Sequence, residues 1–147
     1  MKVITLWEPW ATFVAMKWKT IETRTHQRFK GLTGQRIAIH AAMKFDKTIP
    51  WGKYFRPNIS MSQVDNIIKS ACLNKGAIVC TAMVTDVRWA PNVNFVEREE
   101  WNLKAMCEVA GKFCLFLDDI ELFKPTIPFR GRQGIFEVPD HIIKEGA

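Results

Sequence analysis

Three ionisable side chains fall within six residues of one another, between two apolar stretches near the start of the chain. They are Lys19, Glu22 and Arg24, in the sequence Lys-Trp-Lys-Thr-Ile-Glu-Thr-Arg that spans residues 17–24. An isolated buried charge costs several kcal/mol or more, so a small domain can bury this group only if its members satisfy one another. The segment therefore predicts either a solvated strand end or the floor of a polar cleft.

The same segment is predicted to form a short strand, because it alternates and is rich in β-branched residues. The alternation places Glu22 and Arg24 on one face, so these two side chains should point the same way. Ile21 and Thr23 fall on the other face, which should be turned toward the core. Lys19 precedes the strand, so strand geometry leaves its direction open. A structural ion pair at the strand end is the alternative to a binding site.

A helix is predicted between Ser60 and Gly76. Ser60 and Gln63 have the spacing of a capping box, an apolar stripe at helical spacing follows, and Gly76 supplies a C-terminal stop. The stripe consists of Val64, Ile67, Ile68, Ala71 and Cys72.

Strands outnumber helices in the rest of the chain. They do not alternate regularly with helices, which argues against a doubly wound sheet, and one strand is long enough to bend around a small barrel. We therefore expect an α+β fold, a small mixed or antiparallel β-barrel with two to three flanking helices. The predicted strands cover residues 2–6, 20–24, 36–41, 77–88, 113–123 and 135–138, and the predicted helices cover residues 9–16, 60–75 and 94–111.

Length and composition narrow the class of protein. A chain of 147 residues with 48% hydrophobic and 24% charged residues matches one compact domain, residues 1–147. Its apolar runs fall far short of the ~20 residues of a membrane span, and no export signal is visible. The four cysteines, Cys72, Cys80, Cys107 and Cys114, lie in apolar patterns without a CxxC pair, which predicts buried reduced thiols and a cytoplasmic location.

The charge of the chain bears on its partner. A formal net charge of +6 favours a polyanion such as nucleic acid only weakly. The histidines and cysteines lack metal-ligand spacing, so no metal is expected. The loop of residues 44–56 interleaves basic and aromatic residues, which suits either single-stranded RNA or a solvated loop whose aromatic residues close the barrel.

Three other side chains near the cluster are candidates. Trp7, between the first strand and the first helix, could stack on a base or form a lid on the barrel. Trp10 lies on the apolar stripe of that helix and is expected in the core. His40 ends a predicted strand on the face opposite the core, where it is either a general acid or base or a hydrogen-bonded surface residue.

Five segments, in order along the chain, resemble the ASCH domain of the PUA-like superfamily. Residues 17–24 keep the Lys, Glu and Arg of that family's Gly-x-Lys-x-x-Glu-x-Arg motif, with Lys17 in place of the glycine. The turn before Lys19 therefore need not keep the backbone geometry that glycine permits. Residues 4–11 look like the family's opening strand and Pro-Trp turn. Residues 37–41 and 76–79 look like two of its core strands. Residues 128–136 are similar to its closing Gly-x-Gln-Gly and aromatic strand.

The resemblance implies a barrel with a cleft beside the first helix, where Lys19, Glu22 and Arg24 meet the turn of residues 7–10. ASCH relatives are associated with RNA binding, and some cleave RNA or hydrolyse acylated pyrimidine nucleosides. In the amidohydrolase relatives the position of Glu22 looks like a threonine nucleophile, and that hydroxyl is missing here. Thr23 should face the core, so it is not an obvious substitute.

Three functions remain as alternatives. The first is an RNA- or nucleotide-binding domain without a cofactor, in which Arg24 or Lys19 takes phosphate and Glu22 accepts from a base amino group or a ribose hydroxyl. The second is a hydrolase of RNA or of an N4-acetylcytidine-like nucleoside, with Lys19 and Glu22 as catalytic residues. The third is a protein-interaction module with an apolar patch around Trp51 and Phe55. The expected ligand-binding residues are Trp7, Pro9, Trp10, Lys19, Glu22, Arg24, His40 and Gln133.

Overall fold

The computed structural model describes residues 1–48, 51–54, 59–92 and 94–146. No helix among these residues is long and apolar enough to cross a membrane. The strands are β1 (Lys2–Glu8), β2 (Ile21–Arg24), β3 (Arg36–Phe45), β4 (Ala77–Trp89), β5 (Phe113–Pro128) and β6 (Ile135–Glu137). The helices are α1 (Trp10–Ala15), α2 (Trp51–Tyr54), α3 (Met61–Asn74), α4 (Phe95–Ala105) and α5 (Asp140–Gly146), with short 3-10 turns at Lys30–Leu32 and Ala90–Asn92.

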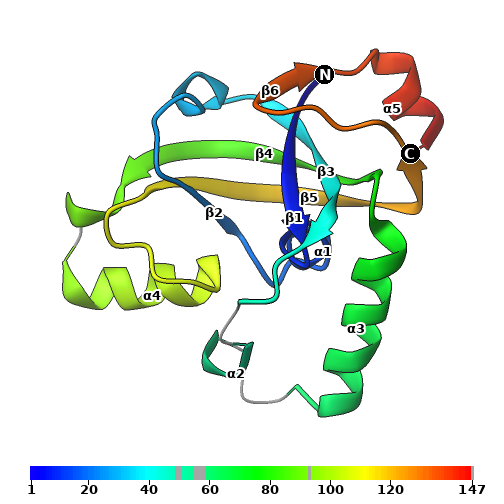
Figure 1. Cartoon of the computed structure of the whole chain (residues 1–147). Coiled ribbons are helices and arrows are strands. Elements are labelled where there is room, and N and C mark those ends of the chain that lie inside the picture. The colour runs from blue at the N-terminus through cyan, green and yellow to red at the C-terminus, as the bar shows by residue number, and fades with distance from the viewer. Residues whose placement is uncertain (49–50, 55–58, 93, 147) are drawn as a thin grey trace.

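These strands form one mixed sheet in the order β2-β5-β4-β3-β1-β6. β1 and β3 are parallel, and the other neighbouring pairs are antiparallel. The two longest strands, β4 and β5, run side by side across the molecule (Figure 1). The prediction of an α+β fold with a mixed sheet is confirmed.

A closed barrel is not confirmed. In the described part of the chain β2 pairs only with β5, and β6 pairs only with residues 2–4 of β1, so both edges of the sheet stay open. The sheet nevertheless curls until Arg24 on β2 reaches β1, where its Nη2 donates to the carbonyl oxygen of Thr5 at 3.1 Å. A side chain rather than a backbone ladder joins these two strands.

The central strands are buried on both faces. On β3, Ile37 and Ile39 belong to the main core cluster, whereas Ala38 joins a second cluster with Phe136 of β6 and Ile143 of α5. α5, which covers this second cluster, was not predicted (Figure 1). Its seven residues are too few to display a helical period.

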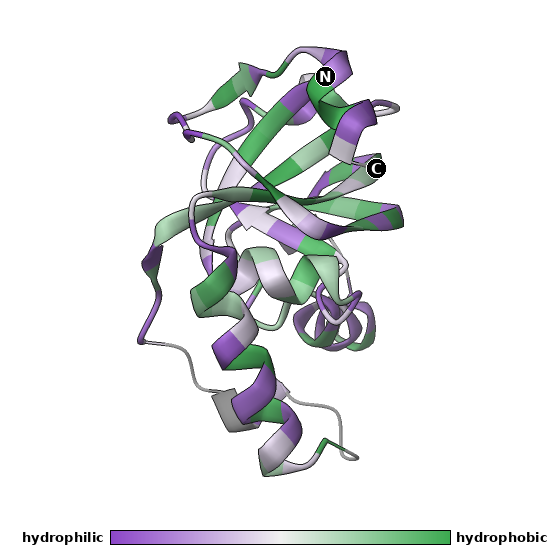
Figure 2. Ribbon diagram, turned by 90° about the vertical axis from the view of Figure 1, so that its right-hand side faces the viewer, coloured by the Kyte–Doolittle hydropathy of each residue, from purple (hydrophilic) through white to green (hydrophobic). Residues whose placement is uncertain are grey.

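The helix predicted after Ser60 is confirmed as α3. Both hydrogen bonds of the capping box are present, from Gln63 N–H to Ser60 Oγ at 3.2 Å and from Ser60 N–H to Gln63 Oε1 at 2.8 Å. Only Ile67 and Ala71 of its described residues are buried, and α3 extends away from the sheet with many hydrophilic residues (Figure 2). Cys72 is exposed for this reason, so the prediction that all four cysteines are buried is wrong.

Several elements end elsewhere than predicted. β3 continues to Phe45, which places His40 in the middle of a strand rather than at its end. β5 continues through Pro125 to Pro128, past its predicted end at residue 123. α4 ends at Ala105, because the next residue takes the left-handed conformation.

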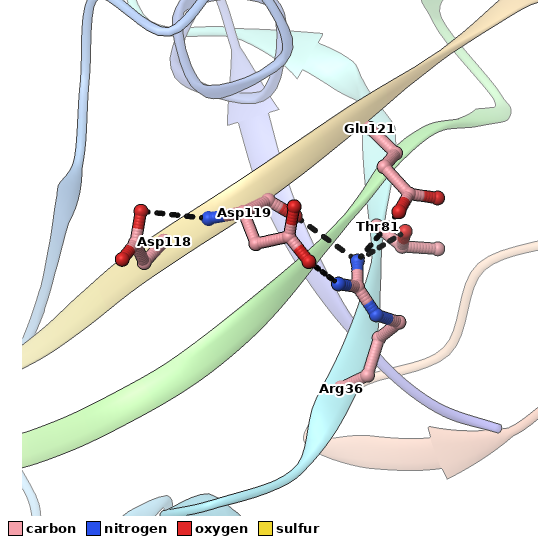
Figure 3. Close-up of polar contacts among 5 residues, drawn as sticks. All are labelled: Arg36, Thr81, Asp118, Asp119 and Glu121. Carbon is pink, nitrogen blue, oxygen red and sulfur yellow. Dashed lines mark hydrogen bonds and ion pairs between the residues drawn. The ribbon is translucent and has the colours of Figure 1, made fainter.

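A polar cross-link ties three neighbouring strands together away from the first helix (Figure 3). Arg36 of β3 donates to Thr81 Oγ1 of β4 at 3.1 Å and to the backbone oxygen of Asp119 of β5 at 3.0 Å. It also pairs with the Asp119 carboxylate and lies 3.7 Å from that of Glu121. The charge of Arg36 is therefore already engaged by the sheet.

Candidate functional site

A cavity of about 1260 Å³ opens at the gap between β2 and β1. We call it the main cavity. Its wall is formed by residues 5–7 of β1, Glu22 and Arg24 of β2, parts of the following loop, His40 and residues 42–44 of β3, and residues 129–135, which lead into β6. Segments distant in sequence therefore build one site.

Positive charge dominates the wall of the main cavity. Its carboxylates belong to Glu22 and Asp46. Its permanent cations are Arg24, Arg28, Lys44, Arg130 and Arg132. Among the described residues of this wall, five cations stand against two carboxylates, which makes the surface attractive to an anionic ligand.

Arg24 is fixed at two points. Its Nη2 donates a hydrogen bond to the Thr5 carbonyl oxygen. Its guanidinium carbon lies 4.8 Å from the centre of the Phe29 ring. The His26 ring stacks on Phe29, with 5.2 Å between the two ring centres. Its Nε atom is buried and has no hydrogen-bond partner among the described residues.

Glu22 is also fixed and incompletely bonded. Its side chain is 7% exposed, and Oε1 accepts the N–H of Thr23 at 2.8 Å. Oε2 is buried without a hydrogen-bond partner in the described part of the chain. Glu22 and Arg24 are on the same face of β2, and both line the main cavity. Among the described residues, no ion pair joins the two side chains.

Lys19 does not meet Arg24. It is 2% exposed, and its Nζ donates to the backbone oxygen of Ala105 at 2.6 Å and lies 5.0 Å from the centre of the Trp10 ring. Its side chain lines a second cavity of about 420 Å³ instead of the main one. One cleft was expected for Lys19, Glu22 and Arg24, and the structure places Lys19 in a different cavity from Arg24.

The second cavity adjoins the main cavity, because Trp10, Glu22 and Asp46 line both. Trp10 Nε1 donates to Asp46 Oδ2 at 3.2 Å. Burial raises the pKa of Asp46, but hydrogen bonds from Thr48 and Trp10 outweigh burial and bring the pKa below its usual value. Thr23, predicted to face the core, is half-buried and lines the second cavity.

Lys17 takes a backbone conformation that favours glycine. Its φ of 63° lies in the left-handed region that glycine enters freely and other residues enter at a cost. The turn before Lys19 therefore has a geometry that the motif's glycine would permit.

His40 is buried rather than on the surface, with 2% of its area exposed. Its Nε2 donates to the Phe129 carbonyl oxygen at 2.8 Å, which leaves Nδ1, 3.3 Å from Thr5 Oγ1, as an acceptor in the neutral ring. Burial lowers the pKa of His40, and the bond to Phe129 partly opposes this shift. Gly131 packs so closely that an added Cβ would lie 2.3 Å from the ring.

The other residues that were expected to bind a ligand do not all line the main cavity. Trp7 is 50% exposed in the wall of the main cavity, with Lys44 Nζ 5.2 Å from its ring centre. Gln133 is exposed in the same wall. Pro9 lines neither cavity and instead caps the N-terminus of α1. Of the two residues proposed for the apolar patch, Phe55 lies outside the described residues, and Trp51 is described by its backbone alone.

Sequence reasoning missed the two arginines of the closing turn. Arg130 and Arg132 flank Gly131 opposite β1, and only the fold brings them to the cavity. Their alternation with glycines was the available signal, but a basic turn is common on any surface.

Glu8 was also missed. It is fully buried beside α1, where it accepts from Thr12 N–H at 3.2 Å and from Thr12 Oγ1–H at 2.8 Å. Burial raises its pKa to about 7, against the opposing effects of the Thr12 hydrogen bonds and the Lys75 charge. Glu8 lines neither cavity, so its role is to hold the end of β1 against α1.

No protein-family model and no curated protein matches the chain. Solved structures do match. The crystal structure of ASCH from Zymomonas mobilis superposes with a TM-score of 0.53 at 14% identity, covering 98% of this chain and 91% of that one. Two point mutants of that protein give a TM-score of 0.51 at 15% identity, covering 98% of this chain and 92% and 94% of theirs.

These matches extend over nearly the whole of both chains, and their low identity limits the conclusion to the fold. The five segments that resemble the ASCH domain in sequence thus belong to a chain with the matching architecture. This protein has the fold of the ASCH domain proteins.

Proposed function

We propose that the main cavity binds single-stranded RNA or a related nucleotide ligand. The observation that carries the proposal is the excess of arginine and lysine side chains over carboxylates in its wall. Arginine and lysine are the usual partners of phosphate oxygens, and Arg130 and Arg132 are both exposed at the turn before β6.

Trp7 supports a nucleotide ligand over a simple anion. Half of its surface is exposed in the same wall, and Lys44 lies over its ring. Stacking of a base on an aromatic side chain contributes ~1–3 kcal/mol. An aromatic surface beside a cation suits a ligand that carries both a base and a phosphate.

Salt-dependent binding tests the proposal. Fluorescence anisotropy with a labelled single-stranded RNA should show affinity falling as salt rises. Arg132→Ala and Arg130→Ala should each reduce the slope of log K against log salt by about 0.7, the value for one lost phosphate contact on a single strand. Arg98→Ala on α4, outside both cavities, is the matched control and should leave the slope unchanged. Absence of binding at low salt contradicts the proposal.

A hydrolase of RNA or of an N4-acylated cytidine is the second candidate. It is favoured by the second cavity, in which Lys19 and Glu22 lie together with the Thr23 hydroxyl. This candidate predicts turnover that Lys19→Ala and Glu22→Ala each abolish while circular dichroism shows an intact fold. Turnover that persists in both variants excludes it.

Neither of the two candidate functions requires a metal or a cofactor. Among the described residues, no three His, Cys, Asp or Glu side chains gather as a possible metal site.

A further inference from the structure

The closing turn, residues 130–134, is held against the sheet by two side chains. In the described part of the chain, no backbone–backbone hydrogen bond outside the strands involves this turn. His40 Nε2 donates to the carbonyl oxygen of Phe129, directly before the turn, at 2.8 Å, and Thr5 Oγ1 donates to that of Arg132 at 3.2 Å. His40 and Thr5 are register partners on β3 and β1, so neighbouring strands supply both anchors.

The His40 ring also packs against the middle of the closing turn. A Cβ added to Gly131 would lie 2.3 Å from a ring carbon, and Phe136 packs edge-on at 6.2 Å between ring centres. Gly131 separates Arg130 and Arg132, which are exposed in the wall of the main cavity and form no ion pair among the described residues. The ring therefore supports the segment that brings both arginines to the cavity.

The protonation state of His40 decides how many of these hydrogen bonds can form at once. A carbonyl oxygen only accepts, so the bond to Phe129 requires a proton on Nε2. In the neutral ring Nδ1 is an acceptor, and the one hydroxyl proton of Thr5 goes either to Nδ1 at 3.3 Å or to the Arg132 carbonyl. In the protonated ring Nδ1–H donates to Thr5 Oγ1, and the hydroxyl proton is left for Arg132. Protonation therefore completes the bonds that hold the turn.

Burial opposes this protonation. It lowers the pKa of His40, and the bond to Phe129 only partly opposes the shift. β1 and β4 place the uncharged Thr5 and Ile78 beside the ring. On the other elements that pack against it, the charged groups nearest in sequence are Arg130 and Arg132 of the turn and Glu137 of β6. The rest of the cavity wall adds Arg24, Arg28 and Lys44 against Glu22 and Asp46, together with His26. Positive charge in excess disfavours another cation here.

We propose, resting on the proposed function, that His40 positions Arg130 and Arg132 for the phosphates of the ligand, and that phosphate binding and protonation of His40 favour each other. A bound anion offsets the excess of cations around the ring, and the protonated ring holds the closing turn through the complete set of bonds. Because such coupling is reciprocal, a ligand that favours the protonated ring binds more tightly as pH falls. His40 is thus a positioning residue that acts through the turn.

The dependence of RNA affinity on pH tests this coupling. Anisotropy with labelled oligouridine at constant ionic strength measures it from about pH 8 to about pH 5, the range in which histidine changes its charge. Wild-type affinity should rise at least about 5-fold over this range, the lower end of ordinary coupling between two sites. His40→Gln keeps an N–H donor for Phe129 but cannot take up a proton, so it should lose the rise. His141→Gln, an exposed residue of α5 outside both cavities, should keep it.

An NMR titration of the His40 ring tests the same coupling in the wild-type protein. Without RNA the pKa of His40 should lie below the ordinary value for histidine, because the ring is buried. Saturation with oligouridine should raise this pKa, and the rise should shrink when Arg130 and Arg132 are both replaced by alanine. This measurement decides the point if His40→Gln does not fold. A pKa that oligouridine does not change overturns the coupling.

The outcomes separate the two proposals. Salt-dependent binding whose affinity is the same at every pH overturns the role of His40 and leaves RNA binding intact. A rise in affinity that persists in His40→Gln belongs to another group, such as His26 in the cavity wall, and also overturns that role. Absence of binding at every pH overturns the proposed function, and this inference with it.

Discussion

Arg24 Nη2 lies 3.1 Å from the carbonyl oxygen of Thr5, and this contact joins β2 to β1 where no backbone ladder does. The open seam between the two strands is also where the main cavity lies. The same guanidinium therefore spans the seam and lines the cavity, so a change at Arg24 should affect both the stability of the seam and the binding of a ligand.

Arg24→Lys separates charge from hydrogen-bonding geometry. Lysine keeps the positive charge but cannot bond Thr5, stack on Phe29 and present an Nε–H at once. We expect RNA affinity to fall roughly 10-fold, because the hydrogen-bonding geometry of the guanidinium is lost, with little change in the salt slope, because lysine keeps the positive charge. A salt slope reduced as far as that expected for Arg132→Ala would contradict this expectation. Anisotropy titrations across salt concentrations measure both quantities.

Glu8→Gln should change the dependence of stability on pH. The pKa of Glu8 is raised from 4.5 to about 7 in the fold, so its contribution to stability is full below 4.5 and is lost as pH rises toward and through 7. The loss amounts to roughly 3 kcal/mol, and glutamine cannot ionise. The variant should therefore gain stability relative to the wild type between about pH 5 and about pH 8.

Urea denaturation at the two pH values measures this difference. Burial lowers the pKa of His40, so His40 contributes stability above its unfolded pKa of 6.5 that is lost as pH falls. Both proteins contain His40, so its effect cancels in the comparison. Parallel pH profiles would contradict a buried, protonated Glu8.

Gly131→Ala should displace His40. The new Cβ would lie 2.3 Å from a ring carbon and 2.6 Å from Nδ1, so the ring must move from its bonds to Thr5 and Phe129. Overpacking of this kind costs ~1–3 kcal/mol of unfolding free energy. Gly31→Ala is the control, since nothing lies within 4 Å of its added Cβ. Equal unfolding free energies of the two variants in urea denaturation would show that the backbone at Gly131 can move away from His40 without a measurable cost.

Lys17→Gly should stabilise the protein. Lys17 has a φ of 63°, which costs a residue with a side chain roughly 1–2 kcal/mol, although glycine also gains entropy in the unfolded chain. We expect a net gain of about 0.5–1 kcal/mol in thermal or urea unfolding. Met106→Gly removes a similar backbone strain at φ 56° but also deletes a buried side chain, so it should destabilise. A loss of stability in Lys17→Gly would mean that the lysine side chain contributes more than its backbone costs.

Local sequence patterns determined a large part of this structure. The capping box of α3, the strand positions and the shared face of Glu22 and Arg24 all depend on neighbours a few residues away, and their periodicity is visible in the sequence. The order of the ASCH-like segments likewise indicated the fold that the solved structures match.

Only the tertiary structure decided what each polar group meets. Lys19 bonds the carbonyl of Ala105, 86 residues away, which takes it out of the main cavity. Glu8 is buried because α1 folds over the end of β1, and Arg132 reaches the cavity because the turn before β6 returns to β1. Such contacts depend on how the sheet curls and where its seam stays open. The helical and strand periods of the sequence do not show which distant residues come into contact. The division of the charged residues 19–24 between two cavities is therefore decided by tertiary packing.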